Sequence, residues 1–372
     1  MKKWKGDRVF LGIVIALVGI GVIMFTSASL GILARNEDKF YNVLASQFIY
    51  GLGGGVIALY AGLRIPYTFW RKYALYFFIL GIILTGLVFV PSLGMTHGGA
   101  TRWVSIFGFS FQPVEFLKIG FIIYFSAWLS WFKGKFADAR IGAIPLVVFV
   151  GISIAILVNQ PDHKSMILII VTGTCMLFMH GISTKHVLSI LLVSAVLFSG
   201  LVFFTPYLRD RIQTFINPSQ NGSTTAWQIQ QSHIAIGSGG MFGRGVGQSI
   251  QKFSYLPEPQ GDSIFAVIGE ELGFVGSVLV VFLFVAFAFR GYRIALHAPD
   301  VFTKMFVAGC ITIMTTQSFM NIASITGVFP LTGVPLVFIS QGGTALLLSL
   351  GMIGIILNIS SHTKKSTTGI SA

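Results

Sequence analysis

Long apolar stretches follow one another along this chain of 372 residues, separated by polar segments. An α-helix needs about 20 apolar residues to cross the hydrocarbon core of a bilayer. Ten stretches reach that length, and they begin near Val9, Asn42, Tyr73, Gln112, Ile141, Ser165, Val187, Ser263, Val301 and Val334. The pattern predicts an all-α polytopic membrane protein with about ten transmembrane helices.

The connections between these stretches are uneven in length. Nearly all are short, but one polar, glycine-rich segment at residues 206–262 separates the seventh predicted helix from the eighth. Long loops in compact proteins usually carry function. We therefore expect a single domain over residues 1–372, with its chemistry concentrated near 206–262 and a short tail over 359–372.

Composition and charge indicate the solvent and the topology. Hydrophobic residues make up 54% of the chain and charged residues only 10%, which excludes a water-soluble globule. The formal charge is +13, and sixteen of the 25 Lys and Arg residues fall in cytoplasmic segments when the N-terminus is placed inside. This predicts a multi-pass protein of the cytoplasmic membrane with both termini cytoplasmic, the 206–262 segment outside, and no nucleic-acid partner.

Carboxylates in or near lipid are costly and often functional. The chain has only twelve Asp and Glu residues. Six of them lie in or beside segments predicted to face outward: Glu115, Asp162, Glu258, Asp262, Glu270 and Glu271. We therefore expect the chemistry at the outer face.

Two groups of charged residues precede the long loop. Glu115 and Lys118 are three residues apart at the start of the fourth predicted helix, so they lie on one face. They form either an intrahelical ion pair or, with Arg102, a site for an anionic headgroup. Asp162 and Lys164 belong to a tight Pro-Asp turn, which is either a solvated turn or part of the same outer pocket.

The long loop contains a second set of candidates. Six glycines fall within residues 237–247 and could expose backbone N–H groups to a phosphate, with Ser238 and Arg244 beside them. The run lacks the spacing of nucleotide-binding glycine motifs, so an ordinary set of turns is the alternative. His233 is either a proton carrier or a structural histidine. Lys252 is a candidate for binding an anion.

Three carboxylates stand at the start of the eighth predicted helix. Asp262 directly precedes it, where the side chain could cap the first free N–H groups, act as a general base, or do both. Glu270 and Glu271 lie about two turns further along, at membrane depth, where a buried carboxylate is a functional candidate.

These motifs recur in order and together resemble the SEDS family of membrane proteins, which includes RodA and FtsW. The similarity covers almost the whole chain. It is carried by Arg102-Trp103, Gln112 to Lys118, Gln160-Pro-Asp162, the glycine-rich run 237–247, Gln251 to Glu258, Asp262 with the helix after it, and Asn321 to Gly343, which includes Ser340. The 251–258 run is more similar to division-type members than to elongation-type members.

The resemblance implies a ten-helix peptidoglycan glycosyltransferase. Such an enzyme polymerises lipid II at the outer face of the membrane during cell division and releases undecaprenyl pyrophosphate. The implied partners are a class B penicillin-binding transpeptidase and other divisome proteins, and the essential carboxylate falls on Asp262. The chain departs from the usual pattern at three places: Gln260-Gly261 and Ser263 around the aspartate, His163-Lys164 in place of Leu-Gly, and Gln341 in place of tyrosine.

Glycan polymerisation requires these kinds of groups. A sugar hydroxyl attacks an anomeric carbon while pyrophosphate leaves, so a carboxylate base and cations that bind the leaving group lower the barrier. We expect Asp262 to be the base, and Mg²⁺ or Mn²⁺ near Glu115 or Asp162 is a further hypothesis. The candidates for substrate binding are Arg102, Glu115, Lys118, Asp162, Lys164, His233, Ser238, Arg244, Lys252, Glu258, Glu270, Glu271 and Ser340.

Three other interpretations stay open from the sequence. A lipid II flippase or an ion-coupled transporter would use Glu270 and Glu271 as a proton relay, although no internal repeat is visible. An elongation-type polymerase would share the same chemistry. A non-catalytic scaffold for the transpeptidase would leave Asp262 dispensable.

Overall fold

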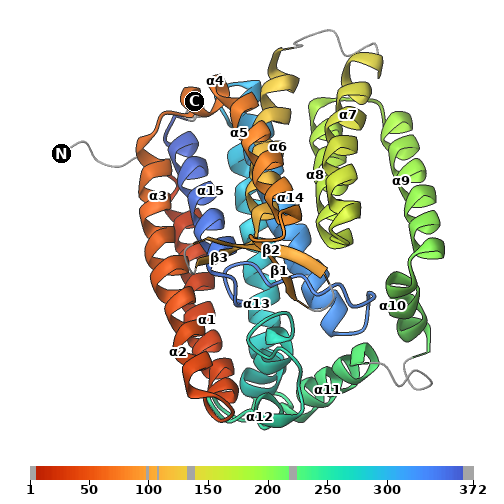
Figure 1. Cartoon of the computed structure of the whole chain (residues 1–372). Helices are drawn as coiled ribbons and strands as arrows, with labels where there is room; N and C mark the ends of the chain where they lie inside the picture. The colour runs from red at the N-terminus through yellow and green to blue at the C-terminus, as the bar shows by residue number, and fades with distance from the viewer. Residues whose placement is uncertain (1–5, 98–99, 107–108, 132–138, 218–223, 363–372) are drawn as a thin grey trace, which may run out of the picture.

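The computed structural model describes residues 6–97, 100–106, 109–131, 139–217 and 224–362. Helices account for 77% of the described residues, which confirms the predicted helical membrane protein (Figure 1). The first half contains α1 (Arg8–Leu33), α2 (Glu37–Ala45), the π-helix η1 (Ser46–Gly53), α3 (Gly54–Arg64), α4 (Tyr67–Lys72), α5 (Ala74–Gly86), the 3-10 helix η2 (Leu87–Phe89), α6 (Pro113–Trp131), α7 (Ala139–Asn159) and α8 (His163–His180).

The second half begins with the helix α9 and then enters the predicted long loop. Its helices are α9 (Thr184–Phe204), α10 (Pro206–Ile216), α11 (Thr224–Ser238), α12 (Gln251–Ser254), α13 (Ile264–Leu296), α14 (Val301–Ile325) and α15 (Gly343–Ser361). Residues 206–262 are therefore not a plain loop, because they form three helices joined by turns. Most of the predicted tail at 359–372 lies outside the described residues.

Eight helical segments in the described ranges are long and apolar enough to cross a membrane. They are α1, the continuous run α2–η1–α3, α6, α8, α9, α13, α14 and α15. Two shorter apolar helices, at 74–89 and 148–159, occupy the third and fifth predicted positions. Ten crossings therefore stay a prediction, while the positions of the apolar helices agree with the sequence pattern.

The helix α14 lies in the core, and α9 lies at the edge. Of the most apolar window of each helix, 83% is buried for α14 and 6% for α9. Figure 1 shows α9 set apart from the central helices, next to α8 and above α10. Because α9 exposes large side chains such as Leu192, Leu197 and Phe204, this helix has a surface suited to lipid.

Glycines allow α3 and α15 to pack backbone against backbone. A Cβ at Gly354 would lie 2.2 Å from the main-chain oxygen of Leu59, and one at Gly62 would lie 2.8 Å from that of Gly351. In lipid, association of helices depends on such close packing. The lipid tails are as apolar as the helix surfaces, so the hydrophobic effect does not drive two helices together. These glycines therefore fix the pairing of the second helical run with the last helix.

Two features differ from the sequence prediction. Residues 94–111 form a three-stranded antiparallel sheet, β1 (Gly94–His97), β2 (Ala100–Ile106) and β3 (Phe109–Phe111), where no strand was expected. The last membrane helix begins at Gly343, so the start predicted near Val334 is wrong. The intervening chain is interrupted by Pro330 and Pro335 and has left-handed backbone at Gly333, and these residues prevent a helix.

The chain after α14 satisfies its carbonyl groups with side chains instead of a helix ladder. We call residues 330–335 the 330–335 segment. Five of its carbonyl oxygens accept hydrogen bonds from buried or half-buried side chains: Ser324 to Pro330, Arg211 to Leu331, Lys164 to Gly333, Asn321 to Val334 and Gln317 to Pro335. Irregular backbone inside a membrane protein requires such donors. The donors come from α8, α10 and α14, so the segment ties these three helices together.

Candidate active site

Asp262 lies immediately before α13, at the junction of α11, α13 and α14. Its Oδ1 accepts a hydrogen bond from Nε2 of Gln228 at 3.1 Å, and the same nitrogen lies 2.9 Å from Oγ of Ser263. Nδ2 of Asn321 donates to the main-chain oxygen of Asp262 at 2.7 Å. The N-cap of α13 is Ser263, so Asp262 does not serve as the cap that the sequence allowed. The carboxylate of Asp262 is therefore available for a role other than capping α13.

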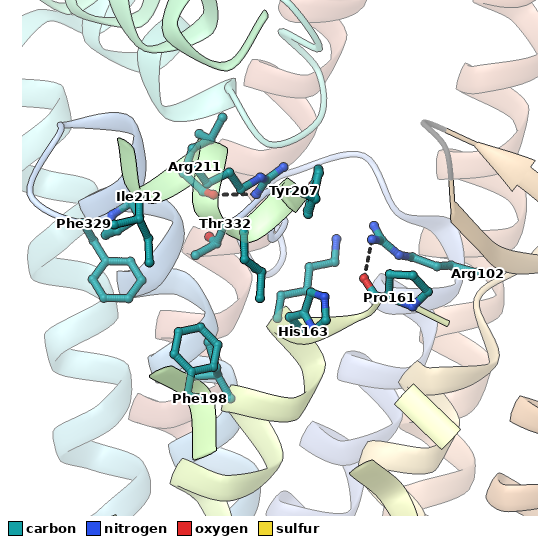
Figure 2. Close-up of a pocket in the computed structure, with 14 residues that line it drawn as sticks. Arg102, Pro161, His163, Phe198, Tyr207, Arg211, Ile212, Phe329 and Thr332 are labelled. Atoms are coloured by element: carbon teal, nitrogen blue, oxygen red, sulfur yellow. Dashed lines mark hydrogen bonds between the residues drawn. The ribbon is translucent and has the colours of Figure 1, made fainter. Parts of the chain in front are cut away.

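A basic cavity lies next to this carboxylate. Arg102, Lys164 and Arg211 line it together with His163. Figure 2 shows the side chains of Arg102 and Arg211 reaching toward the same space from opposite sides. The remaining wall is largely apolar and includes Ile167, Phe198, Leu208, Ile212, Phe329 and Leu331. Such a cavity can hold an anionic group that continues into a hydrocarbon chain.

Gly333 connects the cavity to Asp262. Nζ of Lys164 donates to the main-chain oxygen of Gly333 at 2.6 Å. A Cβ built on Gly333 would lie 3.3 Å from Oδ2 of Asp262 and 3.7 Å from a terminal nitrogen of Arg211. Gly333 has φ of 64°, which an L side chain rarely adopts. The bare backbone at this position therefore allows a carboxylate and two cations to gather around it.

The electrostatic environment of Asp262 raises the affinity of its carboxylate for a proton. Burial raises the pKa of Asp262 above its usual value of 3.8, and the charge of Glu258 raises it further. The same pKa is lowered by the charges of Lys164 and Arg211 and by the hydrogen bond from Gln228, which oppose the effect of burial. Because the cations oppose the burial, the carboxylate can ionise and still bind a proton more readily than an exposed aspartate.

The Glu115 and Lys118 pair lies elsewhere, between α6, α14 and α15. Nζ of Lys118 lies 2.8 Å from Oε1 of Glu115 and 3.1 Å from Oε1 of Gln317. Lys118 is 5% exposed, and the two charges line a separate small cavity. The intrahelical ion pair is the alternative that the geometry supports, and Arg102 does not join it. Arg102 instead donates to the main-chain oxygens of Pro161 and Gln160.

The glycine-rich run binds the kinked start of α13. The backbone N–H groups of Arg244 and Gly245 donate to the main-chain oxygens of Glu270 and Glu271, each at 3.0 Å. The helix bends at Gly273, where φ is 68°. Since these amides already have acceptors inside the protein, the expected phosphate cradle is not formed by them. Arg244 itself stays partly exposed, with Nε 3.7 Å from Oε1 of Glu270.

Glu270, Glu271 and Lys252 form a buried cluster apart from the basic cavity. Nζ of Lys252 lies 2.7 Å from Oε1 of Glu271 and 2.9 Å from Oγ of Ser27 in α1. Oγ of Ser249 and the N–H of residue 250 donate to Glu270 at 2.5 and 3.0 Å. All three charged side chains are at most 1% exposed. They hold α1, α12 and α13 together, and a substrate cannot reach them in this arrangement.

The remaining predicted residues have local partners. The fully buried Asp162 is the N-cap of α8 and accepts from the N–H and Oγ of Ser165 at 3.4 and 2.8 Å. Oγ of Ser340 accepts from the N–H of Leu336 at 2.7 Å, and Oγ of Ser238 donates to Ala235. His233 is exposed, while Glu258 accepts from Nε2 of Gln260 at 3.1 Å and has left-handed backbone beside Asp262.

The residues at 115 and 162 do not fit a metal site built from protein ligands. Glu115 is bonded to Lys118, and Asp162 is bonded to Ser165. Among the described residues, no group of three or more His, Cys, Asp or Glu side chains could hold a metal ion.

Comparison with known proteins decides the family. The family model for FtsW, RodA and SpoVE, described as cell cycle protein, matches residues 7–365. The chain belongs to this family. Stage V sporulation protein E of Bacillus subtilis (strain 168) is 36% identical over 365 residues, which cover 98% of this chain and 99% of that protein. A probable peptidoglycan glycosyltransferase FtsW of Trichlorobacter lovleyi is 37% identical over 358 residues, covering 96% of this chain and 94% of that protein.

Solved structures of the FtsW, RodA and SpoVE family share the fold. A chain of a peptidoglycan synthase complex, studied for its coordination of polymerization and crosslinking, matches with a TM-score of 0.78 and 23% identity over 95% of this chain and 97% of that one. The rod shape determining protein RodA of Thermus thermophilus matches with a TM-score of 0.70 and 22% identity over 97% of this chain and 98% of that one. The helical arrangement is therefore shared with these solved structures.

Sequence reasoning missed four residues of the site: His163, Arg211, Gln228 and Asn321. His163 stood out only as a departure from the family pattern, and Arg211 only as one basic residue of the long loop. A signal for Arg211 exists in the sequence, because an arginine in an otherwise amphipathic segment that follows a membrane helix is suited to an interfacial anion. The amides carried no such signal, since their roles depend on contacts between distant segments.

Lys252 provides a test of the buried cluster. Replacing Lys252 with Met removes the charge and leaves Glu271 buried without its cation, which typically costs about 3 to 5 kcal/mol. We expect Lys252→Met to unfold at a clearly lower temperature than wild type, measured on the purified protein in detergent. The double variant Lys252→Met/Glu271→Gln should recover part of the loss.

The exposed Lys39 offers the matched control, because Lys39→Met removes the same charge at the surface of α2 and should leave the unfolding temperature unchanged. If Lys252→Met unfolded like wild type, the cluster would not be holding the fold.

Proposed function

We infer that this chain is a peptidoglycan glycosyltransferase of the division type, which polymerises lipid II into glycan strands and releases undecaprenyl pyrophosphate. The observation that carries the proposal is the position of Asp262 beside a cavity with three basic residues and a largely apolar wall. Membership in the FtsW, RodA and SpoVE family supports the same activity, because full-length relatives are named as probable peptidoglycan glycosyltransferases.

The cavity suits the chemistry of a lipid-linked diphosphate. Arg102, Lys164 and Arg211 supply positive charge for the diphosphate, whose negative charge increases as it leaves. Phe198 and Ile167 offer an apolar wall for the first part of the polyprenyl chain. The exposed and weakly packed α9 borders this wall, so the chain of the lipid can extend from the cavity toward the bilayer.

Asp262 accepts a proton in this mechanism. The 4-hydroxyl of one saccharide forms a bond to the anomeric carbon of another, while the bond from that carbon to the diphosphate oxygen breaks. The hydroxyl proton passes to the carboxylate, and the electron pair of the broken bond stays on the diphosphate. Gln228 fixes the carboxylate through Oδ1, which leaves Oδ2, on the side of Gly333, for the hydroxyl.

The distribution of basic residues and the related proteins support a membrane location, an orientation and a partner for this chain. We place both termini in the cytoplasm and Asp262 at the outer face of the cytoplasmic membrane of a bacterium, because sixteen of 25 basic residues then fall inside. A class B penicillin-binding transpeptidase is the proposed partner, together with other divisome proteins. A related fold occurs in a peptidoglycan synthase complex, which supports a partner of this kind.

The rival functions draw less support from the arrangement. A transporter would need Glu270 and Glu271 along a polar path, but both carboxylates are engaged by Lys252, Ser249 and Ser27. An elongation-type polymerase would use the same cavity. The division role is preferred because the relative at 36% identity is named stage V sporulation protein E and the relative at 37% identity is named a probable FtsW. A scaffold would not need a carboxylate fixed beside a cavity that three cations line.

Asp262→Asn tests the base. The amide keeps an oxygen for Gln228 but cannot take up the proton, so we expect polymerisation of labelled lipid II to fall by about 10²- to 10⁴-fold. The assay uses the full chain with its transpeptidase partner and separates glycan strands by gel. Asp38→Asn, at an exposed carboxylate of α2, is the matched control and should polymerise like wild type.

Two outcomes would overturn the proposal. Polymer from Asp262→Asn at the wild-type rate would exclude the carboxylate as the base. Movement of lipid II across liposome membranes by the wild type, without any polymer, would favour the flippase.

The pH dependence of the rate tests the electrostatics around Asp262. Because a general base works when ionised, the rate should rise with pH through the pKa of Asp262, which burial places above 3.8. Removing the cation in Lys164→Gln should shift this rise to higher pH, and removing the anion in Glu258→Gln should shift it to lower pH. The comparison uses kcat at saturating lipid II, and equal profiles for the two variants would contradict the assignment.

A further inference from the structure

His163 is the first residue of α8 and is buried without a hydrogen bond. Its side chain is 7% exposed, and neither Nδ1 nor Nε2 has a hydrogen-bond partner among the described residues. A buried polar group without a partner costs about 1 to 3 kcal/mol, and such groups are rare in native proteins. The described part of the protein therefore provides no hydrogen-bond partner for the imidazole.

The imidazole faces the basic cavity. His163 is one of the residues that line it, and Figure 2 shows the ring between the side of Phe198 and the side of Pro161 and Arg102. The charged groups that act on the ring are Arg102, Asp162 and Arg211. The missing partner would thus come from whatever occupies the cavity.

The polar groups of the neighbouring turn are already used. The carboxylate of Asp162 accepts from Ser165, and the main-chain oxygen of Pro161 accepts from Arg102. Lys164 donates to Gly333, on the far side of the turn. Since none of these groups bonds to the ring, its N–H can donate to an acceptor on a ligand that enters between the cations.

We propose that His163 binds the lipid-linked diphosphate by donating a ring N–H to one of its phosphate oxygens. The proposal rests on the proposed function and adds a fourth, uncharged donor to Arg102, Lys164 and Arg211. A neutral imidazole carries one N–H donor, so it adds a hydrogen bond without adding a fixed charge. A further lysine at this position would face strong repulsion from the three cations already present.

The substitution His163→Leu replaces the imidazole with an apolar side chain of similar size and removes the donor. His163→Asn and His163→Gln keep an amide N–H near the positions of Nδ1 and Nε2, respectively. The three variants together separate the donor from the packing of the side chain.

The experiment measures binding of farnesyl diphosphate to the purified full chain in nanodiscs by calorimetry. We expect His163→Leu to weaken binding by about tenfold, as for loss of one hydrogen bond to a charged group. One of His163→Asn and His163→Gln should recover most of the affinity. His186→Leu, at an exposed histidine at the start of α9, is the matched control and should bind like wild type.

Three probes distinguish the source of the anion. Inorganic diphosphate reports on the anion alone, farnesol on the hydrocarbon chain alone, and farnesyl diphosphate on both. The effect of His163→Leu should appear with both diphosphates and be absent with farnesol. A loss seen with farnesol as well would mean that the variant has changed the shape of the cavity, and the proposal would be wrong.

The remaining outcomes separate a failure of the His163 proposal from a failure of the proposed function. If His163→Leu bound farnesyl diphosphate as tightly as wild type while Arg102→Ala did not, His163 would not contact the anion and the proposed function would stand. If Asp262→Asn still polymerised lipid II, the proposed function would fail independently of these affinities. Should His163→Leu not fold, wild-type affinity of either the Asn or the Gln variant would support the donor, and loss of affinity in both would overturn it.

Discussion

The 330–335 segment needs hydrogen-bond donors for its carbonyl groups, and this requirement organises the candidate active site. A chain that leaves α14 and returns to α15 without a helix cannot satisfy its backbone internally. Lys164 and Arg211 provide two of the missing donors, from α8 and α10. The same two side chains line the cavity and act on Asp262. One structural constraint thus places the cations beside the base.

Asn321 shows how the constraint extends to the carboxylate itself. Its Nδ2 donates to the main-chain oxygens of Asp262 and Val334, both at 2.7 Å. The start of α13 and the 330–335 segment are therefore held at a fixed separation by one amide from α14. Packing of the core helix α14 in this way determines the geometry at the reacting groups, which residues on mobile loops could not maintain.

The helices and the local residue pairs could be predicted from the sequence. The contacts between residues far apart in the chain, which assemble the candidate site, could not. The lengths of the apolar stretches predicted the helices, and the three-residue spacing of Glu115 and Lys118 predicted a pair on one face, because both patterns depend on neighbours in the chain. Lys164 and Gly333 are 169 residues apart, so no local pattern could bring them together. The same holds for Lys252 and Glu271, whose charges suggested substrate binding until their burial was known. The strands at 94–111 and the late start of α15 depend on tertiary packing that outweighs local preference.

Locating the diphosphate in a structure of the complex with a polyprenyl diphosphate tests the central claim most directly. The account predicts both phosphorus atoms inside the basic cavity, with phosphate oxygens within hydrogen-bond distance of Arg102, Lys164 and Arg211. Phosphorus density beside Lys118 between α6 and α14, or against Arg244 on the glycine-rich run, would contradict it.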